Sequence, residues 1–313
     1  MRKGSLILLI ALCGFSCKEK KTVKAGVKMQ DFIISISQYA RAQDPDFILI
    51  PQNGEEVLFT DTDPEKGLRS DLIQAINGYG VEELFYNGDS YAPDDYRLNM
   101  LRQASPGIKI MVADYLSNDA DATNAFQLAD MDQFIAFPRY NVNYDYKYIP
   151  STVHHENAND IQTLSQAQNY LYLISTESYA EKASFLDAIR QSNFDVVIID
   201  AFFGDDLLTF DEVASLKTKQ NGGKRLVISY MNIGSAEKYR YYWKKNWGLH
   251  HPLWLKKKYD GYKDEIWVKF WKDEWQEIIY GNDNSYTQKL LNAGFDGAYL
   301  DNIEGFYFLY HKD

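Results

Sequence analysis

The fold is indicated by the stretch Phe194-Asp195-Val196-Val197-Ile198-Ile199-Asp200, in which an apolar run ends in a carboxylate. A run that is apolar at consecutive positions is typical of a parallel strand, because helices cover both faces of such a strand. Similar runs recur along the chain, most of them about 25 to 40 residues apart, which is the length of one βα unit. The eight runs are residues 47–50, 81–86, 108–112, 170–174, 196–199, 226–230, 266–270 and 298–300.

Helices are predicted between several of these runs, at 181–191, 211–220, 236–245 and 274–292. Eight strands that alternate with helices predict an α/β fold. We expect a single (β/α)8 TIM barrel, with an open doubly wound sheet as the alternative. The length of 313 residues suits one barrel of roughly 250 residues plus insertions.

A long insertion is predicted around residues 115–169. It holds one acidic, helix-like piece at 119–132 and then a stretch in which tyrosines alternate with polar residues between 140 and 148. Long loops without regular structure are often functional, and a loop after a middle strand of a barrel lies over the mouth. We therefore predict that 140–148 forms a lid whose tyrosines stack on sugar rings.

The N-terminus has the pattern of an export signal. Arg2 and Lys3 precede an apolar run at 6–12 that is too short to span a bilayer. Gly14-Phe15-Ser16-Cys17 follows, with a charged stretch directly after it, and this arrangement resembles the lipobox of bacterial lipoproteins. An ordinary cleaved signal peptide and lipidation of Cys13 are the alternatives. We predict a signal peptide at 1–16, a lipid on Cys17, a tether at 17–29 and a domain at 30–313, anchored to the outer membrane or the cell surface.

Composition excludes some kinds of partner. The net charge of −11 argues against nucleic acid, because surfaces that bind phosphate backbones are basic. It favours a neutral or a cationic ligand. Both cysteines precede residue 30, so the predicted domain has no disulfide. We expect no cofactor and a monomeric protein.

Polar side chains follow several predicted strands, and barrels keep their active sites at the carboxyl ends of their strands. A single aspartate at such a place is commonly a helix cap, but several on one rim favour a functional site. The candidates are Asn53 after the first strand, Asp114 after the third, Asp200 after the fifth, Tyr230, Asn232 and Glu237 around the sixth, and Asp301 and Glu304 after the last.

Asp200 and Glu237 follow consecutive predicted strands, so their side chains can reach one shared space. Neighbouring strands lie about 4.8 Å apart, and glycoside hydrolysis needs two carboxyls about 5 to 9.5 Å apart. One carboxyl donates a proton to the leaving oxygen, and the other acts as nucleophile or activates water. We therefore predict that these two residues are catalytic.

A family resemblance supports this interpretation. The segment Gly234-Ser235-Ala236-Glu237-Lys238-Tyr239-Arg240 resembles the Gly-x-x-Glu-x-(Trp/Tyr)-Arg signature of glycoside hydrolase family 114, the endo-α-1,4-polygalactosaminidases and their relatives. Residues 294–302 are similar to the last strand of that family, and 195–200 and 267–275 also fit. Residues 44–54 match a bacterial exported branch, so the resemblance covers roughly 30–310.

The resemblance implies a barrel that makes internal cuts in a polysaccharide containing α-1,4-linked galactosamine. It implies no metal and no cofactor. Asp200 and Glu237 match acidic positions of the family to which we assign catalysis, and Asp301 matches an acidic position of the last strand that we expect to hold substrate or to tune the pair. The chain departs from the exported branch at Ser235, where Gly-Glu-Ala-Glu is common, and at Glu304, where Asp is usual. A glycan-binding lipoprotein on a hydrolase-like barrel is the alternative function.

Three further sets of residues are interpreted structurally. The pairs His154-His155 and His250-His251 are not expected to bind metal, because adjacent side chains project differently and no helical His-x-x-x-His spacing accompanies them. Residues 239, 242 and 243 have helical spacing and are expected in the core. Arg240 is expected to pair with a rim carboxylate, next to bound substrate.

Overall fold

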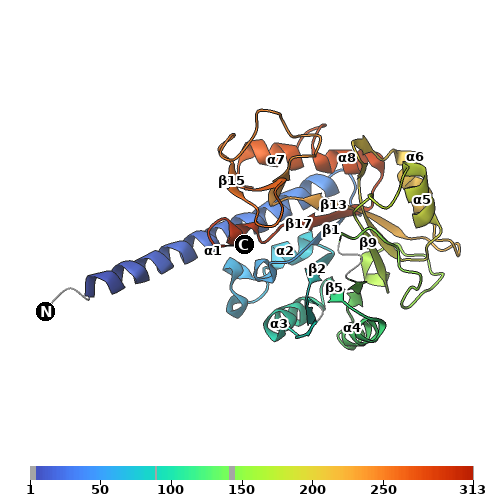
Figure 1. Ribbon diagram of the computed structural model, residues 1–313, viewed down its shortest axis with the longest axis horizontal. Coiled ribbons are helices and arrows are strands. Elements are labelled where there is room, and N and C mark those ends of the chain that lie inside the picture. Colours follow the sequence, from blue (N-terminus) through green and yellow to red (C-terminus); the bar gives the residue numbers. More distant parts are fainter. Residues whose placement is uncertain (1–4, 89, 141–144, 313) are drawn as a thin grey trace.

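The computed structural model describes residues 5–88, 90–140 and 145–312, and of residues 5–17 it describes the backbone alone. The side chain of Cys17 and the whole of Tyr144 therefore lie outside the described part. The molecule is a mixed α/β structure in which helices surround parallel strands, and the N-terminal part of α1 (Ser5–Arg41) projects from it (Figure 1). The predicted tether belongs to α1, and its residues Thr22, Ala25 and Met29 are buried. The domain boundaries remain a prediction.

The main parallel strands form two sheets of order β9-β10-β13-β17-β1 and β2-β5-β7, and β6 (Tyr115–Leu116) and β8 (Arg139–Tyr140) form a separate short parallel pair. A parallel bridge between Gln52 and Gly80 links β1 to β2, so the strands follow one another in chain order. Within the described residues, no strand pairing joins β7 to β9. The α/β class and the parallel order are confirmed, and closure of the barrel remains a prediction. The strands are β1 (Ile48–Pro51), β2 (Gly78–Glu82), β5 (Lys109–Ala113), β7 (Ile135–Ala136), β9 (Tyr170–Leu173), β10 (Val196–Asp200), β13 (Leu226–Asn232) and β17 (Gly297–Asp301).

One predicted barrel strand is wrong. Residues 266–270 lie outside the parallel series, because β13 pairs directly with β17. Glu265–Val268 forms β16, which is antiparallel to β14 (Ser235–Glu237) and β15 (Leu255–Lys258). The strand that replaces it is β7, which lies inside the predicted insertion. An apolar run does not show the direction of its partner strand, and two residues are too few to form a pattern.

Two helix predictions are also wrong. Residues 236–245 begin in β14 and continue in turns, so Tyr239 is exposed whereas Tyr242 is buried. Residues 274–292 form two helices, α7 (Asp273–Ile279) and α8 (Tyr286–Ala293), separated by a turn in which Gly281 has φ 98°. The other helices after α1 are α2 (Ser70–Ala75), α3 (Asp95–Ala104), α4 (Asp119–Met131), α5 (Lys182–Arg190), α6 (Phe210–Leu216) and α9 (Gly305–Phe308), with 3-10 turns at Glu55–Leu58, Thr60–Thr62, Pro64–Lys66 and Leu164–Gln166.

Short connecting strands complete the structure: β3 (Tyr86–Asn87) pairs with β4 (Ser90–Tyr91), β6 (Tyr115–Leu116) with β8 (Arg139–Tyr140), and β11 (Phe202–Phe203) with β12 (Asp206–Leu207). Local chemistry fixes several helix ends. α6 begins with a capping box of Thr209 and Glu212, and α8 stops at Gly294, whose φ of 76° suits a residue without a Cβ. These caps satisfy backbone groups that the helix itself cannot pair.

Large tyrosine rings fill the space between the parallel strands. Tyr172 and Tyr299 pack edge to face with ring centres 5.2 Å apart, and Tyr172 donates a hydrogen bond of 2.9 Å to Gln52. Tyr299 reaches over Gly80, where a Cβ would lie 1.9 Å from its hydroxyl. The interior is therefore packed, and the polar ends of the strands are left to form a cavity.

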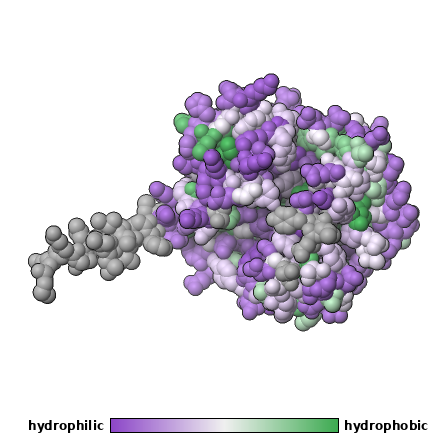
Figure 2. All heavy atoms as spheres, in the orientation of Figure 1, coloured by the Kyte–Doolittle hydropathy of each residue, from purple (hydrophilic) through white to green (hydrophobic). Residues whose placement is uncertain are grey.

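The outer surface is mostly hydrophilic on the face seen in Figure 2, with a few separate hydrophobic spots. Among the described residues, no helix combines the length and apolar character that crossing a membrane requires.

Candidate active site

A cavity of about 690 Å³ opens at the carboxyl ends of the parallel strands. Gln52 follows β1, and Glu82, Asp200 and Asp301 end β2, β10 and β17, while Tyr230 lies near the carboxyl end of β13; all five line the cavity. Much of the remaining wall comes from loops, including 174–177 after β9, residues between 259 and 264 that connect β15 to β16, and 145–146 of the predicted insertion. Because parallel strands end at one edge, side chains that are distant in the sequence meet here.

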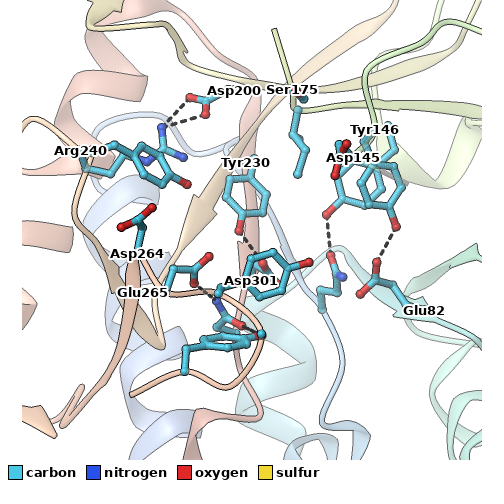
Figure 3. Close-up of a pocket in the computed structure, with 18 of the residues that line it drawn as sticks. Glu82, Asp145, Tyr146, Ser175, Asp200, Tyr230, Arg240, Asp264, Glu265 and Asp301 are labelled. Atoms are coloured by element: carbon cyan, nitrogen blue, oxygen red, sulfur yellow. Dashed lines mark hydrogen bonds and ion pairs between the residues drawn. The ribbon is translucent and has the colours of Figure 1, made fainter. Parts of the chain in front are cut away.

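Arg240 holds Asp200 and Glu237 together, as its predicted pairing with a rim carboxylate requires. Its Nη1 donates to both oxygens of Asp200 at 2.9 and 2.8 Å, and its Nε donates to Oε2 of Glu237 at 2.7 Å. Tyr239 donates from its hydroxyl to Oε1 of Glu237 at 2.5 Å. The phenol and the guanidinium thus orient the two predicted catalytic carboxylates around one cation (Figure 3 shows Asp200 and Arg240).

The two carboxylates differ in access to the cavity. The side chain of Asp200 is 14% exposed and lines the wall, whereas that of Glu237 is 2% exposed and lies behind Tyr239 and Arg240. Burial raises the pKa of Asp200, although the charge of Arg240 acts in the opposite direction. A ligand reaches Asp200 directly, and it reaches Glu237 only where the Tyr239 ring gives way.

Asp301 and Tyr230 form a second pair in the wall. The Tyr230 hydroxyl donates to Oδ2 of Asp301 at 2.5 Å, and Figure 3 shows the ring directed at this carboxyl. Burial raises the pKa of Asp301, and the nearby charge of Glu82 raises it further. Burial likewise raises the pKa of Glu304, beside Asp301, and Oε2 of Glu304 has no hydrogen-bond partner within the described structure. Both groups favour the neutral acid.

Glu82 is a wall residue that was missed at the sequence level. It accepts hydrogen bonds from the hydroxyls of Tyr115 at 2.8 Å and Tyr146 at 2.5 Å, and from Nδ2 of Asn53 at 3.2 Å. It ends β2, so the rule that a carboxylate follows a strand identifies it. The predicted run 81–86 begins three residues after β2 does, and this shift hid Glu82 within the run.

Glu265 is the second wall carboxylate that was missed. It lies on β16 directly opposite Glu237. Ser235 donates to its Oε2 at 2.6 Å, and Asn232 donates to the same oxygen at 3.2 Å. Burial raises the pKa of Glu265 to about 8, and the charge of Glu237 adds to the shift. The sequence did not indicate Glu265 as a site residue, because residues 266–270 were predicted as a parallel barrel strand. Glu265 would then lie at the start of that strand, at the end of the barrel opposite to the cavity.

Other predicted site residues are divided between the wall and the interior. Asn53 and Glu304 line the cavity together with Tyr230, Asp301 and Arg240. Asn232 is buried behind the wall, where it donates to Ser235 and Glu265. Asp114 does not line the cavity, because its Oδ1 accepts hydrogen bonds from the backbone amides of Phe85 and Tyr86. Asp114 thus anchors the loop after β2, and a role for it in binding substrate remains a prediction.

The predicted lid is in part a fixed wall. Tyr146 is buried, stacks on Tyr172 with ring centres 4.0 Å apart, and lines the cavity. Tyr140 donates instead to Asp119 at 2.8 Å, and Tyr148 is exposed. In the described part of the chain, the cavity contains no cluster of histidine, cysteine and carboxylate ligands that is arranged for a metal ion.

Comparison with known proteins assigns the chain to a family. Residues 151–313, more than half of the chain, match the sequence model of glycoside-hydrolase family GH114. The chain belongs to this family. The matched part contains Asp200, Glu237, Glu265 and Asp301, so the family region supplies both the predicted catalytic pair and two further cavity carboxyls with raised pKa.

Curated proteins also match part of this chain. The chain is 32% identical over 151 residues to an uncharacterized protein of Methanocaldococcus jannaschii, MJ1477, and the match covers 48% of this chain and 41% of the relative. It is also 32% identical over 139 residues to an uncharacterized protein of Thermotoga maritima, covering 44% and 39%. The chain thus spans about two fifths of the length of these relatives. Glu82 and Asn53 lie before the family match.

Proposed function

We propose that this protein is an endo-acting glycoside hydrolase that cleaves a polysaccharide containing α-1,4-linked galactosamine, with Asp200 and Glu237 as its catalytic carboxylates. The observation that carries the proposal is the single guanidinium of Arg240, which contacts both carboxylates at the cavity wall. Two carboxylates that share one guanidinium are close neighbours, and hydrolysis needs a separation of about 5 to 9.5 Å. Membership of the GH114 family supports the same reaction class.

The surroundings supply what the reaction needs. Asp200 faces the cavity with a raised pKa, which favours a proton available for the leaving oxygen. Glu237 is held by Arg240 and Tyr239 with its oxygens fixed in position. When a sugar hydroxyl replaces the Tyr239 hydroxyl, Glu237 becomes able to act on the sugar ring or on water. Tyr239 is thus the gate of this pair.

The charge of the wall supports an amino sugar as substrate. Eight carboxyl side chains line the cavity, whereas three of its lining residues are basic, namely Arg139, Arg240 and Lys263. An enclosed wall with an excess of acidic groups attracts cations. A polymer with free amino groups carries such cations, so partial deacetylation of the galactosamine is expected to favour binding.

The test uses the purified protein and partly deacetylated α-1,4-galactosaminan, with new reducing ends counted over time. Asp200→Asn and Glu237→Gln are each expected to lower the rate by about 10² to 10⁴, the usual contribution of one positioned acid or base. Asp264→Asn is the matched control, because Asp264 also lines the cavity but is exposed and lies 3.6 Å from Lys238. It is expected to retain most of the rate. Wild-type rates in both carboxylate variants would contradict the assignment.

A non-catalytic glycan-binding protein is the second candidate. Ser235 favours it, because a serine stands in the signature where an acidic residue is common, and it is fully engaged with Glu265, Asn232 and Asn302. A binding protein would retain the polymer without releasing ends, and both amide variants would bind as tightly as the wild type. An enzyme releases ends and loses this activity in the variants.

We also propose that the protein is exported and lipid-anchored through Cys17. The support is the sequence alone, namely the apolar run at 6–12 and the small residue before Cys17. Labelled fatty acid is expected in the full-length wild type and not in Cys17→Ser. Equal labelling of both proteins would contradict the anchor.

A further inference from the structure

A cluster of two histidines and one aspartate lies away from the cavity. Asp130 is in the last turn of α4, and His154 and His155 are in the segment before β9. α4 leads into the start of β7, and the carbonyl of His155 accepts from Nδ2 of Asn169, directly before β9. The cluster therefore lies near the amino ends of these strands, at the opposite end from the cavity.

The two imidazoles converge on one carboxylate. Nε2 of His154 lies 3.0 Å from Oδ2 of Asp130, and Nε2 of His155 lies 3.0 Å from Oδ1. The candidate ligand atoms all lie within 4.8 Å of one another. Adjacent histidines were not expected to bind one metal ion, because their side chains were expected to diverge. His155 instead has φ 53°, a left-handed conformation that turns the chain and brings both rings to the same side.

Packing fixes the rings while leaving the cluster open. The His154 ring stacks on Phe126 with centres 4.1 Å apart, and lies 3.9 Å from the His155 ring. Nδ2 of Asn157 donates to the carbonyl of His155 at 3.1 Å, which holds the turn in place. The side chains of the three cluster residues are 29 to 48% exposed, so an ion from solvent can reach them.

We propose that Asp130, His154 and His155 form a binding site for a divalent first-row transition-metal ion such as Zn²⁺. Two imidazole nitrogens and one carboxylate oxygen are a ligand set that suits such ions, whereas Ca²⁺ and Mg²⁺ prefer oxygen ligands alone. Zn²⁺ takes these atoms at about 2.0 to 2.2 Å, and small ring rotations about the present positions bring them there. Water completes a tetrahedral set.

The ion would join two parts of the chain that are distant in sequence. α4 carries one ligand, and the irregular segment between β8 and β9 carries the other two. That segment also supplies Tyr146 to the cavity wall. Bound metal thus stabilises the folded state, because the unfolded chain holds no such arrangement of ligands. It contributes no group to the reaction.

The test is a titration of the full chain, first freed of metal with a chelator, with ZnCl₂ alone. Calorimetry is expected to show one Zn²⁺ per chain, and the unfolding temperature is expected to rise on addition of Zn²⁺ and to fall again with EDTA. We expect Zn²⁺ to bind more weakly to each of the variants Asp130→Asn, His154→Gln and His155→Gln. Each decrease in affinity should exceed the decrease of about 10- to 100-fold that follows the loss of a residue that only hydrogen-bonds to a metal ligand.

Two controls separate the site from general binding by surface groups. Asp132→Asn changes a carboxylate two residues from Asp130 that pairs with Arg102 at 2.7 Å, and it should leave Zn²⁺ binding unchanged. The double variant His250→Gln with His251→Gln removes the other adjacent histidine pair and should also bind normally. No binding to the wild type, or loss of binding in the His250 and His251 variant, would overturn the proposal.

A measurement on the wild type alone tests the site even if the variants do not fold. X-ray absorption of the Zn²⁺-loaded protein is expected to show two imidazole ligands and oxygen ligands at the metal. A spectrum without two imidazole ligands would overturn the site, because Zn²⁺ would then be bound elsewhere. Two histidines that merely hydrogen-bond to Asp130 would give neither stoichiometric binding nor this spectrum.

Discussion

Two buried ion pairs at opposite ends of the parallel strands make different use of the same interaction. At the amino end of β10, Lys219 contacts Asp195 at 2.8 Å, and both side chains are fully buried. At the carboxyl end, Arg240 contacts Asp200 and Glu237 at the wall of a cavity. Asp195 and Asp200 lie near the two ends of the stretch 194–200, on which the fold prediction rests. The surroundings of the two pairs decide which one is structural and which one is available for chemistry.

The Lys219 pair is closed. Nζ of Lys219 also donates to the carbonyl and the side-chain oxygen of Asn157, and Asp195 accepts from Nδ2 of Asn157 and from the amide of Gln168. Hydrogen bonds within the protein thus occupy the charged groups of Lys219 and Asp195, so these groups are not available to a ligand. In the Arg240 cluster, Asp200 faces the cavity, so a ligand can exchange with protein partners. A buried charge pair is evidence of function where one side of it meets a cavity.

The largest effect is expected from breaking the closed pair. Lys219→Met leaves Asp195 buried without its cation, and loss of one partner of a buried pair costs about 3 to 5 kcal/mol. We expect the free energy of unfolding, measured by urea denaturation, to fall by this amount, while the rate per folded molecule stays unchanged. A change below 1 kcal/mol would contradict the structural role of this pair.

A smaller loss is expected at the cavity. Arg240→Gln leaves two carboxylates without their cation, but Asp200 can then be hydrated from the cavity, so we expect a loss of about 2 kcal/mol. The hydrolytic rate should fall far more than stability does, because both carboxylates lose their orientation. Urea denaturation and the reducing-end assay measure the two effects. If Arg240→Gln lost as much stability as Lys219→Met and kept its hydrolytic activity, the two ion pairs would both be structural, which would contradict the distinction between them.

The acids of the wall make stability depend on pH. The pKa of Glu265 is about 8 in the folded state, above its ordinary value, so the folded state retains a proton that the unfolded chain has lost. The free energy of unfolding should therefore be highest below about pH 4.5 for this group and should fall as pH rises through 8. Glu265→Gln should reduce the fall between pH 6 and 8 by about 2 kcal/mol, since the contribution of this group changes by at most about 1.4 kcal/mol for each pH unit.

Asp301, Glu304 and Asp114 also have raised pKa values, and they remain in both proteins. The comparison of Glu265→Gln with the wild type across pH therefore isolates one group. Equal slopes for the two proteins would show that Glu265 is ionised in the folded state at neutral pH.

The smallest effect is expected at Tyr230. Tyr230→Phe removes the hydroxyl that donates to Asp301 at 2.5 Å, and a typical hydrogen bond contributes about 1 kcal/mol. This bond lowers the pKa of Asp301, so its loss should raise that pKa and move the alkaline limb of the rate profile to higher pH. The profile, measured from pH 4 to 9, distinguishes this from simple loss of packing, which would lower the rate at every pH.

Much of the site follows from sequence patterns that are local. Asp200 and Asp301 were found because each ends an apolar run, and β10 and β17 do end at these residues. Glu82 obeys the same rule and was missed because the boundary of its strand was placed too late. Glu265 could not be found this way, because it lies on an antiparallel strand whose partner is set by the turn after β13.

The sequence by itself determined the α/β class, the parallel strands and the carboxylates at their ends, because these follow from which neighbouring residues are apolar. The tertiary structure alone decided that Glu237 lies behind Tyr239 and Arg240 rather than in the open cavity. It also decided that His154 and His155 converge, through one left-handed residue. Direction of side chains depends on backbone torsions and on partner strands, and neither is encoded in the spacing of residue types.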